Sequence, residues 1–179
     1  MYEVELKLPA DHEPVRERLA EMGADSRGTV EQADTYYDHP VREFEETDEA
    51  VRVRRESTDD GSRAAVTYKG PLVEAESKTR EEVETRVEDG EAMDRLLREL
   101  GFEPAATVEK RRERFDHEGY TITLDSVAGL GEYVEVETES ETIAPAREGA
   151  VALLSELGLD PSDQVRTSYL GLLLAESNG

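Results

Sequence analysis

Two glutamates and a lysine alternate along the first predicted strand, at Glu3, Glu5 and Lys7. Side chains on a strand point alternately to its two faces, so these three charged groups share one face while the apolar residues between them share the other. Paired carboxylates are the oxygen ligands that Mg²⁺ and Mn²⁺ prefer, and an ammonium group binds anions. An ordinary antiparallel strand with one face in water would show the same alternation. The other strands therefore decide what this face does.

The same mixture of acids and bases recurs on one face of the later strands. The acids are Glu3, Glu5, Glu82, Glu84, Asp125, Glu135 and Glu137, and the bases are Lys7, Arg52, Arg54, Lys69, Arg80, Arg86, Lys110 and Arg112. The whole chain has 44 acidic residues against 21 basic ones, so the near balance on these faces departs from the composition. Because unpaired buried charge is expensive, we expect these faces to point into one shared enclosure.

The order of predicted elements is consistent with such an enclosure. Strands are predicted over residues 2–8, 29–38, 50–54, 64–69, 80–88, 107–116, 120–125 and 133–137, and a polar loop over residues 72–79. Helices are predicted near residues 13–23, 91–100, 146–157 and 165–175. About eight antiparallel strands can close into a barrel with room for one small ligand. The predicted fold class is α+β: a closed eight-stranded antiparallel β-barrel, or tunnel, with a charged interior and helices covering its outside.

One domain spanning residues 1–179 is expected from the length. An internal repeat of about residues 1–78 and 79–145 is also predicted. Glu3 to Lys7 aligns with Glu82 to Arg86, and Met22-Gly23 aligns with Leu100-Gly101.

Composition excludes several kinds of protein. The net charge of −23 is too acidic for a general binder of nucleic acid or of anionic membranes. There is no cysteine for a disulfide or thiolate site, and no apolar run approaches the ~20 residues of a membrane span. The N-terminus shows no signal-peptide pattern, so we expect a cytoplasmic protein. The acid excess, with 17 Arg against 4 Lys, further predicts adaptation to concentrated salt.

The enclosed charges combine two chemistries. Carboxylates suit Mg²⁺ or Mn²⁺, whereas several Arg and Lys side chains suit a polyanion. A polyanion bridged by divalent metal ions satisfies both groups at once. Phosphate chains are the candidate ligands.

The motifs resemble those of the CYTH superfamily, also called triphosphate tunnel metalloenzymes. The matching segments are Glu3-x-Glu5-x-Lys7, Asp34-Thr35-Tyr36-Tyr37-Asp38, Arg52-Val53-Arg54, Thr67-Tyr68-Lys69-Gly70-Pro71, Arg80 through Glu84, Lys110-Arg111-Arg112, Leu124-Asp125-Ser126-Val127, Leu130 through Glu137, and Ser168-Tyr169-Leu170. The superfamily comprises class IV adenylate cyclases, thiamine triphosphatases and inorganic triphosphatases. The resemblance implies an eight-stranded tunnel that binds a triphosphate with one or two divalent metals, Mg²⁺ or Mn²⁺. The motifs are most similar to those of the adenylate cyclase branch.

Site residues follow from this resemblance, position by position. It implies metal ligands at Glu3, Glu5, Asp125, Glu135 and Glu137, with Asp125 completing or supporting the site. It implies substrate-binding residues at Lys7, Arg52, Arg54, Lys69, Arg86, Lys110 and Arg112, and catalytic roles for Glu3, Glu5, Lys7, Arg52, Arg54 and Lys69. Three functions stay open: an adenylate cyclase, an inorganic or thiamine triphosphatase, and a non-catalytic binder of nucleotide or polyphosphate. A monomer or a homodimer is expected.

Overall fold

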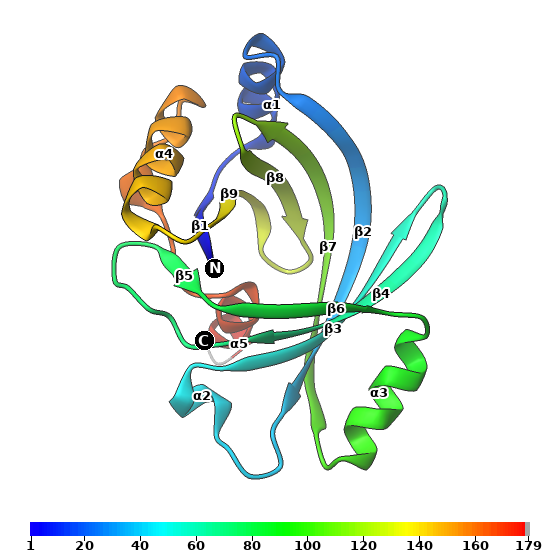
Figure 1. Cartoon of the computed structure of the whole chain (residues 1–179). Helices are drawn as coiled ribbons and strands as arrows, with labels where there is room; N and C mark the ends of the chain where they lie inside the picture. Colours follow the sequence, from blue (N-terminus) through cyan, green and yellow to red (C-terminus); the bar gives the residue numbers. More distant parts are fainter. Residues whose placement is uncertain (178–179) are drawn as a thin grey trace.

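Nine antiparallel strands form one sheet in the computed structural model, which describes residues 1–177. The strands lie in the order β5-β1-β9-β8-β7-β2-β3-β4-β6 (Figure 1). Their bounds are β1 Tyr2–Pro9, β2 Asp25–Asp38, β3 Ala50–Thr58, β4 Gly61–Lys69, β5 Lys78–Arg80, β6 Glu82–Val87, β7 Glu103–His117, β8 Tyr120–Val127 and β9 Gly131–Ser140.

One kinked segment joins the two edges of this sheet. β5 pairs with β1, β6 pairs with β4, and only Glu81 separates β5 from β6. The carbonyl of Glu81 instead accepts a hydrogen bond of 2.9 Å from the amide of Gly70. The sheet is therefore a barrel that is closed apart from this break. The structure has nine strands where the sequence predicted eight, because the predicted strand 80–88 is divided at Glu81 into β5 and β6. The first of these, β5, begins at Lys78, inside the segment predicted to be a loop.

Helices cover the outer, apolar face of the barrel, as the sequence predicted. Their bounds are α1 His12–Glu21, α2 Phe44–Thr47, α3 Gly90–Glu99, α4 Ile143–Glu156 and α5 Tyr169–Ser177, with a 3₁₀ turn at Pro161–Asp163. Helices α1 and α4 enclose a core with β1, β8 and β9 that includes Leu6, Leu19, Ile122, Val136 and Leu154. Helix α3 covers a second cluster, around Tyr37, Val53 and Leu97. Figure 1 shows α1 and α4 at one side of the barrel and α3 at the other.

The C-terminal helix differs from its predicted extent. It begins at Tyr169 rather than near residue 165, because the preceding segment pairs with β1: the amide of Val165 donates to the carbonyl of Lys7 at 2.7 Å. Tyr169 at the start of α5 packs against Val108 and Val127, which face the barrel interior. Helix α5 therefore closes one end of the barrel.

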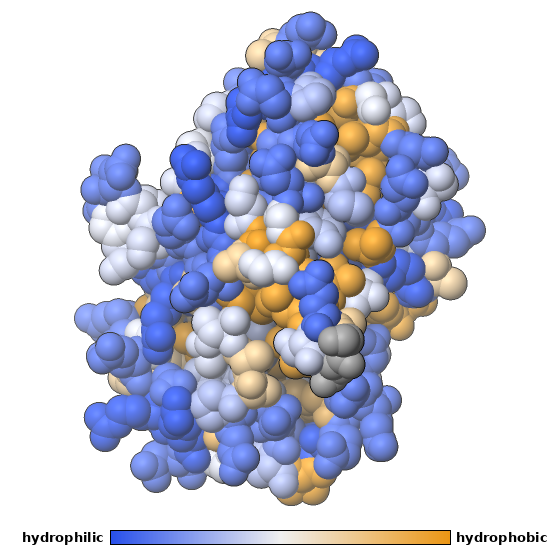
Figure 2. Space-filling model, turned by 180° about the vertical axis from the view of Figure 1, so that it is seen from behind, coloured by the Kyte–Doolittle hydropathy of each residue, from blue (hydrophilic) through white to orange (hydrophobic). Residues whose placement is uncertain are grey.

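The outside of the molecule is largely polar. Seen from behind, hydrophilic residues cover much of the surface (Figure 2). Among residues 1–177, no helix has both the length and the apolar character that a membrane crossing requires.

Candidate active site in the barrel interior

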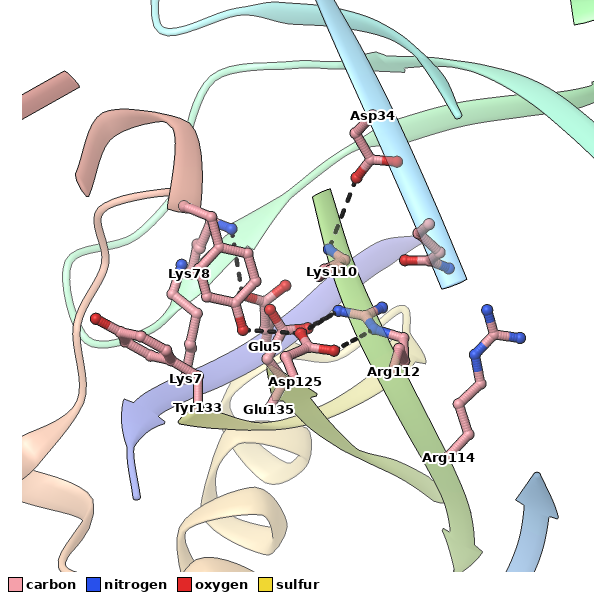
Figure 3. Close-up of polar contacts among 12 residues, drawn as sticks. Glu5, Lys7, Asp34, Lys78, Lys110, Arg112, Arg114, Asp125, Tyr133 and Glu135 are labelled. Carbon is pink, nitrogen blue, oxygen red and sulfur yellow. Dashed lines mark hydrogen bonds and ion pairs between the residues drawn. The ribbon is translucent and has the colours of Figure 1, made fainter. Parts of the chain in front are cut away.

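A cavity of about 850 Å³ lies inside the barrel, lined mainly by the charged faces of the strands. Its lining includes 12 acidic and 11 basic residues, whereas the whole chain has 44 and 21. More than half of all basic residues therefore line this one cavity, and the predicted convergence of the charged faces is confirmed. The close-up in Figure 3 shows side chains from β1, β7 and β9 turned toward one another across this space.

Three glutamates form a cluster that could hold a metal ion. One carboxylate oxygen from each of Glu3, Glu5 and Glu137 lies within 4.8 Å of the others. The cluster forms because β1 and β9 are neighbours in which Glu5 pairs with Glu137. Burial, with repulsion from Glu137, raises the pKa of Glu3 well above its usual value; burial, with repulsion from Glu135, raises the pKa of Glu137 to about 7. Glu5 is buried, and Glu3 and Glu137 are half-buried. Mutually repelling carboxylates in such a site suit a divalent cation, which would relieve the repulsion, so these residues fit Mg²⁺ or Mn²⁺.

Glu135, the next predicted ligand, is held by a cation of the protein. Its carboxylate accepts a hydrogen bond of 2.9 Å from Nη2 of Arg112. Burial opposes ionisation of this group, but Arg112 and Lys110 outweigh burial and lower the pKa of Glu135. Glu135 is thus an ionised carboxylate beside the cluster, and its role as a metal ligand stays a prediction.

Asp125 is fully buried and lies outside the cavity lining. Its Oδ1 accepts a hydrogen bond of 2.7 Å from Nε of Arg112, and its Oδ2 accepts one of 2.6 Å from Nη2 of the same residue. Oδ2 also accepts a hydrogen bond of 2.8 Å from the hydroxyl of Tyr169. With both oxygens engaged, Asp125 orients Arg112. Of the two roles predicted for Asp125, completing the metal site or supporting it, this arrangement fits the supporting one.

Basic side chains gather around one buried carboxylate, Asp34. Arg54 binds both its oxygens at 2.7 Å, and Arg52 and Lys110 lie 3.5 and 3.6 Å from it. Burial opposes ionisation, but Arg54 and Arg52 keep the pKa of Asp34 below its usual value. The pKa of Lys110 is lowered to about 7, because burial and repulsion from Arg112 and Arg54 outweigh the attraction of the nearby aspartates. Asp34 was not among the site residues predicted from the sequence, although its position on the inward face of the predicted strand 29–38 could have indicated it.

Further cations come from β4, β5 and β6. Lys69 pairs with Glu82, and Lys78 lies 3.2 Å from Glu5 of the glutamate cluster. Arg86 lines the cavity from an exposed position on β6. Arg80 donates to the carbonyl of Gly70 at 2.7 Å and so holds the turn after β4. Lys78 was not predicted as a site residue, because residues 72–79 were expected to form a loop.

Lys7 has a different environment from the other predicted phosphate ligands. It is 1% exposed and does not line the cavity. Its Nζ donates to the carbonyl of Thr167 at 2.6 Å and lies 4.4 Å from the ring centre of Tyr169. Burial and repulsion from Lys78 lower the pKa of Lys7 to about 8. Its contact with substrate stays a prediction. Tyr169, noted in the sequence only as part of a motif, contacts Lys7 and also lines the cavity.

Comparison with known proteins connects this geometry to a family. Residues 1–169 match the model of the CYTH domain. A Methanocaldococcus jannaschii protein that bears the name "Putative adenylate cyclase" is 36% identical over 176 residues, covering 96% of this chain and 98% of that protein. A solved structure of a Pyrococcus horikoshii protein is 40% identical with a TM-score of 0.90, covering 97% and 99% of the two chains.

A more distant solved structure shares the fold alone. It is a Hippeastrum protein that is 16% identical, with a TM-score of 0.70 and coverage of 98% of this chain and 95% of that one. It is described as a "putative adenylyl cyclase" with a dominant triphosphatase activity.

Proposed function

Since the chain belongs to the CYTH domain family, we propose that it is a metal-dependent enzyme acting on a triphosphate inside the barrel. Its proposed reaction is that of a class IV adenylate cyclase, which converts ATP to cyclic AMP and pyrophosphate. One observation carries the proposal: a cluster of three glutamates shares one cavity with arginine and lysine side chains from several strands. This pairing of a cation site with an anion site suits a metal-bound triphosphate.

In this proposal the basic side chains hold the triphosphate. Arg52, Arg54 and Arg112 present guanidinium groups, which match phosphate oxygens in a two-point geometry, and Lys69 and Lys110 add point charges. Asp34 keeps Arg52 and Arg54 in place before substrate arrives, and Asp125 does the same for Arg112. Preorganised charges of this kind stabilise a transition state without reorganisation during the reaction.

Glu3, Glu5 and Glu137 would hold the divalent ion, with Glu135 beside them. When bound, such an ion lowers the pKa of an attacking hydroxyl and neutralises charge on departing pyrophosphate. The remaining contribution of the chain is positioning. A triphosphate held along the tunnel places the ribose 3′-oxygen in line with the α-phosphorus and the bond that breaks.

Hydrolysis of inorganic or thiamine triphosphate is a second candidate. The organised groups in the cavity are those that a triphosphate and a metal require, and hydrolysis needs little more than a water in the same site. The name of the M. jannaschii relative favours cyclisation. The activity described for the Hippeastrum protein belongs to a chain that resembles this one in fold alone, so it does not decide between the two reactions.

Product analysis tests both reactions. The protein is incubated in high KCl with Mg²⁺ or Mn²⁺ and with either ATP or inorganic tripolyphosphate, and the nucleotides and phosphates are resolved. Cyclic AMP with equimolar pyrophosphate supports the cyclase. Orthophosphate released from tripolyphosphate, with ATP unchanged, replaces the cyclase with a triphosphatase at the same site.

Variants connect any turnover to the cavity. The pair Glu3→Gln and Glu5→Gln should abolish turnover, whereas Glu31→Gln, an exposed acid on the outer face of β2, should leave it unchanged. Binding of both substrates without turnover in the wild-type protein would contradict the enzyme and favour a non-catalytic binding module.

A further inference from the structure

Tyr169 lies where the C-terminal helix meets the basic side of the cavity. It is 6% exposed, lines the cavity, and packs edge-on against Tyr133 with ring centres 5.3 Å apart. The ammonium groups of Lys7 and Lys110 lie 4.4 and 5.0 Å from its ring centre. An aromatic face attracts cations at such distances, most strongly when water is excluded. One ring therefore contacts two lysines that reach it from β1 and β7.

The hydroxyl of Tyr169 is connected to a third cation, Arg112, through the carboxylate of Asp125. It donates to Oδ2 of Asp125 at 2.8 Å, and the same carboxylate holds Arg112 through two hydrogen bonds. Arg112 also contacts Glu135 at 2.9 Å, beside the glutamate cluster. A tyrosine from the C-terminal helix thus contacts two cations directly, Lys7 and Lys110, and a third, Arg112, through Asp125. Figure 3 shows Lys7, Lys110, Arg112 and Asp125 gathered in this region.

The segment that delivers Tyr169 is itself fixed to β1 at Lys7. The backbone carbonyl of Lys7 accepts from the amide of Val165 at 2.7 Å, and its side chain donates to the carbonyl of Thr167 at 2.6 Å. Lys7 is therefore engaged on both its main chain and its side chain by the residues just before α5. Its ammonium is used to hold this segment rather than exposed to the cavity.

We infer that Tyr169 is a positioning residue of the triphosphate site, and that Lys7 acts on that site through Tyr169 by anchoring the segment that carries it. The inference rests on the proposed function, because it assigns Tyr169 to the binding of that triphosphate. The ring of Tyr169 supports Lys110, and its hydroxyl fixes Asp125 and hence Arg112. Helix α5 is in this way part of the binding site as well as a cover for the end of the barrel.

Two substitutions separate the roles of ring and hydroxyl. Tyr169→Phe keeps the ring but loses the hydrogen bond to Asp125, whereas Tyr169→Leu loses both. We expect the affinity for inorganic tripolyphosphate with Mg²⁺, measured by titration calorimetry, to fall about tenfold in the Phe variant, because a hydrogen bond to a charged group is lost. The Leu variant should bind more weakly still. Tyr120→Phe is the control, since its hydroxyl donates to the carbonyl of Ala146 between β8 and α4, outside the cavity.

The link to Lys7 is tested by a double substitution. If Lys7 acts through Tyr169, Lys7→Met combined with Tyr169→Leu should weaken binding no more than the stronger of the two single changes. If Lys7 binds phosphate independently, the two losses should multiply. Multiplying losses would overturn the assignment of Lys7.

The outcomes distinguish this inference from the proposed function. If the wild-type protein fails to bind tripolyphosphate, the proposed function is wrong and the inference with it. If the wild-type protein binds and both Tyr169 variants bind equally well, with only a lower melting temperature, Tyr169 merely anchors α5 and the inference alone is wrong. Because the Phe variant removes a single hydroxyl, it provides this test even if the Leu variant does not fold.

Discussion

Arg54 binds Asp34 through two parallel hydrogen bonds of 2.7 Å, with the carboxylate almost fully buried in the barrel wall. The same carboxylate lies within 4 Å of Arg52 and Lys110. One aspartate thus organises three of the cations that we propose to bind the triphosphate. Its position links the stability of the barrel to the shape of the site.

Asp34→Asn should destabilise the protein and weaken triphosphate binding together. Removing one partner of a buried ion pair typically costs about 3–5 kcal/mol, because the other charge is left uncompensated. Asp25→Asn, an exposed position at the far end of β2, is the control and should change little. Chemical denaturation and calorimetric binding measure the two effects, and normal stability in the Asn variant would contradict this role.

The Asp34 cluster also predicts a contribution to acid unfolding. Because the pKa of Asp34 is lowered in the folded protein, its stabilisation is fully present above the unfolded value of about 3.9 and is lost as the pH falls below it. The wild-type free energy of unfolding should therefore fall more steeply than that of Asp34→Asn between about pH 5 and pH 2. Parallel curves for the two proteins would exclude a lowered pKa at Asp34.

Lys110 predicts a pH dependence of triphosphate binding. Since burial lowers the pKa of Lys110 to about 7, the free protein holds it largely neutral above that pH, and a bound polyanion should restore its proton. Affinity should therefore decline as the pH rises from about 6 to about 9, with proton uptake visible in calorimetry with buffers of different ionisation enthalpy.

Arginine substitutions isolate the contribution of Lys110. Lys110→Arg stays charged throughout this range and should reduce the decline in affinity. Lys78→Arg is the matched control, because Glu5 and Glu135 overcome burial to raise the pKa of Lys78, so that it is charged in either form. An equal decline in all three proteins would assign the effect to another group, such as Lys7, whose pKa of about 8 falls in the same range.

Metal binding should stabilise the folded barrel. An ion that binds only the folded state adds about 2.7 kcal/mol at one hundred times its dissociation constant. Mg²⁺ or Mn²⁺ should therefore raise the melting temperature of the wild-type protein, and EDTA should reverse the rise. The double variant Glu5→Gln, Glu137→Gln should show no such rise, whereas Glu31→Gln should keep it. A rise that persists in the double variant would place the ion elsewhere.

Salt should stabilise this protein. Most of its 44 acidic residues lie outside the cavity, and the net charge of −23 creates repulsion that added ions screen. The melting temperature should rise between about 0.1 M and about 3 M KCl, where the screening length falls to ~3 Å or less. At a pH near the isoelectric point of about 4.4 the rise should shrink. A flat profile at neutral pH would remove the predicted adaptation to salt.

The sequence by itself determined most of the strands and helices and the charged faces. Glu3, Glu5 and Lys7 reveal their common face because the side-chain period of a strand is local and fixed at two residues. Glycine after the first helix marks its end, where Gly23 adopts a φ of 71° that other residues seldom take. The balance of acids and bases on the strand faces indicated one enclosure, because buried charge must be compensated wherever the strands pair.

Only the tertiary structure decided which charges meet. Glu137 joins Glu3 and Glu5, whereas Glu135, two residues away, binds Arg112, and this difference depends on the register between β1, β9 and β7. Tyr169 reaches Lys7 although more than 160 positions separate them in the chain, because the segment before α5 pairs with β1. Such long-range pairings depend on the whole closed barrel, and no local pattern of residue types specifies them.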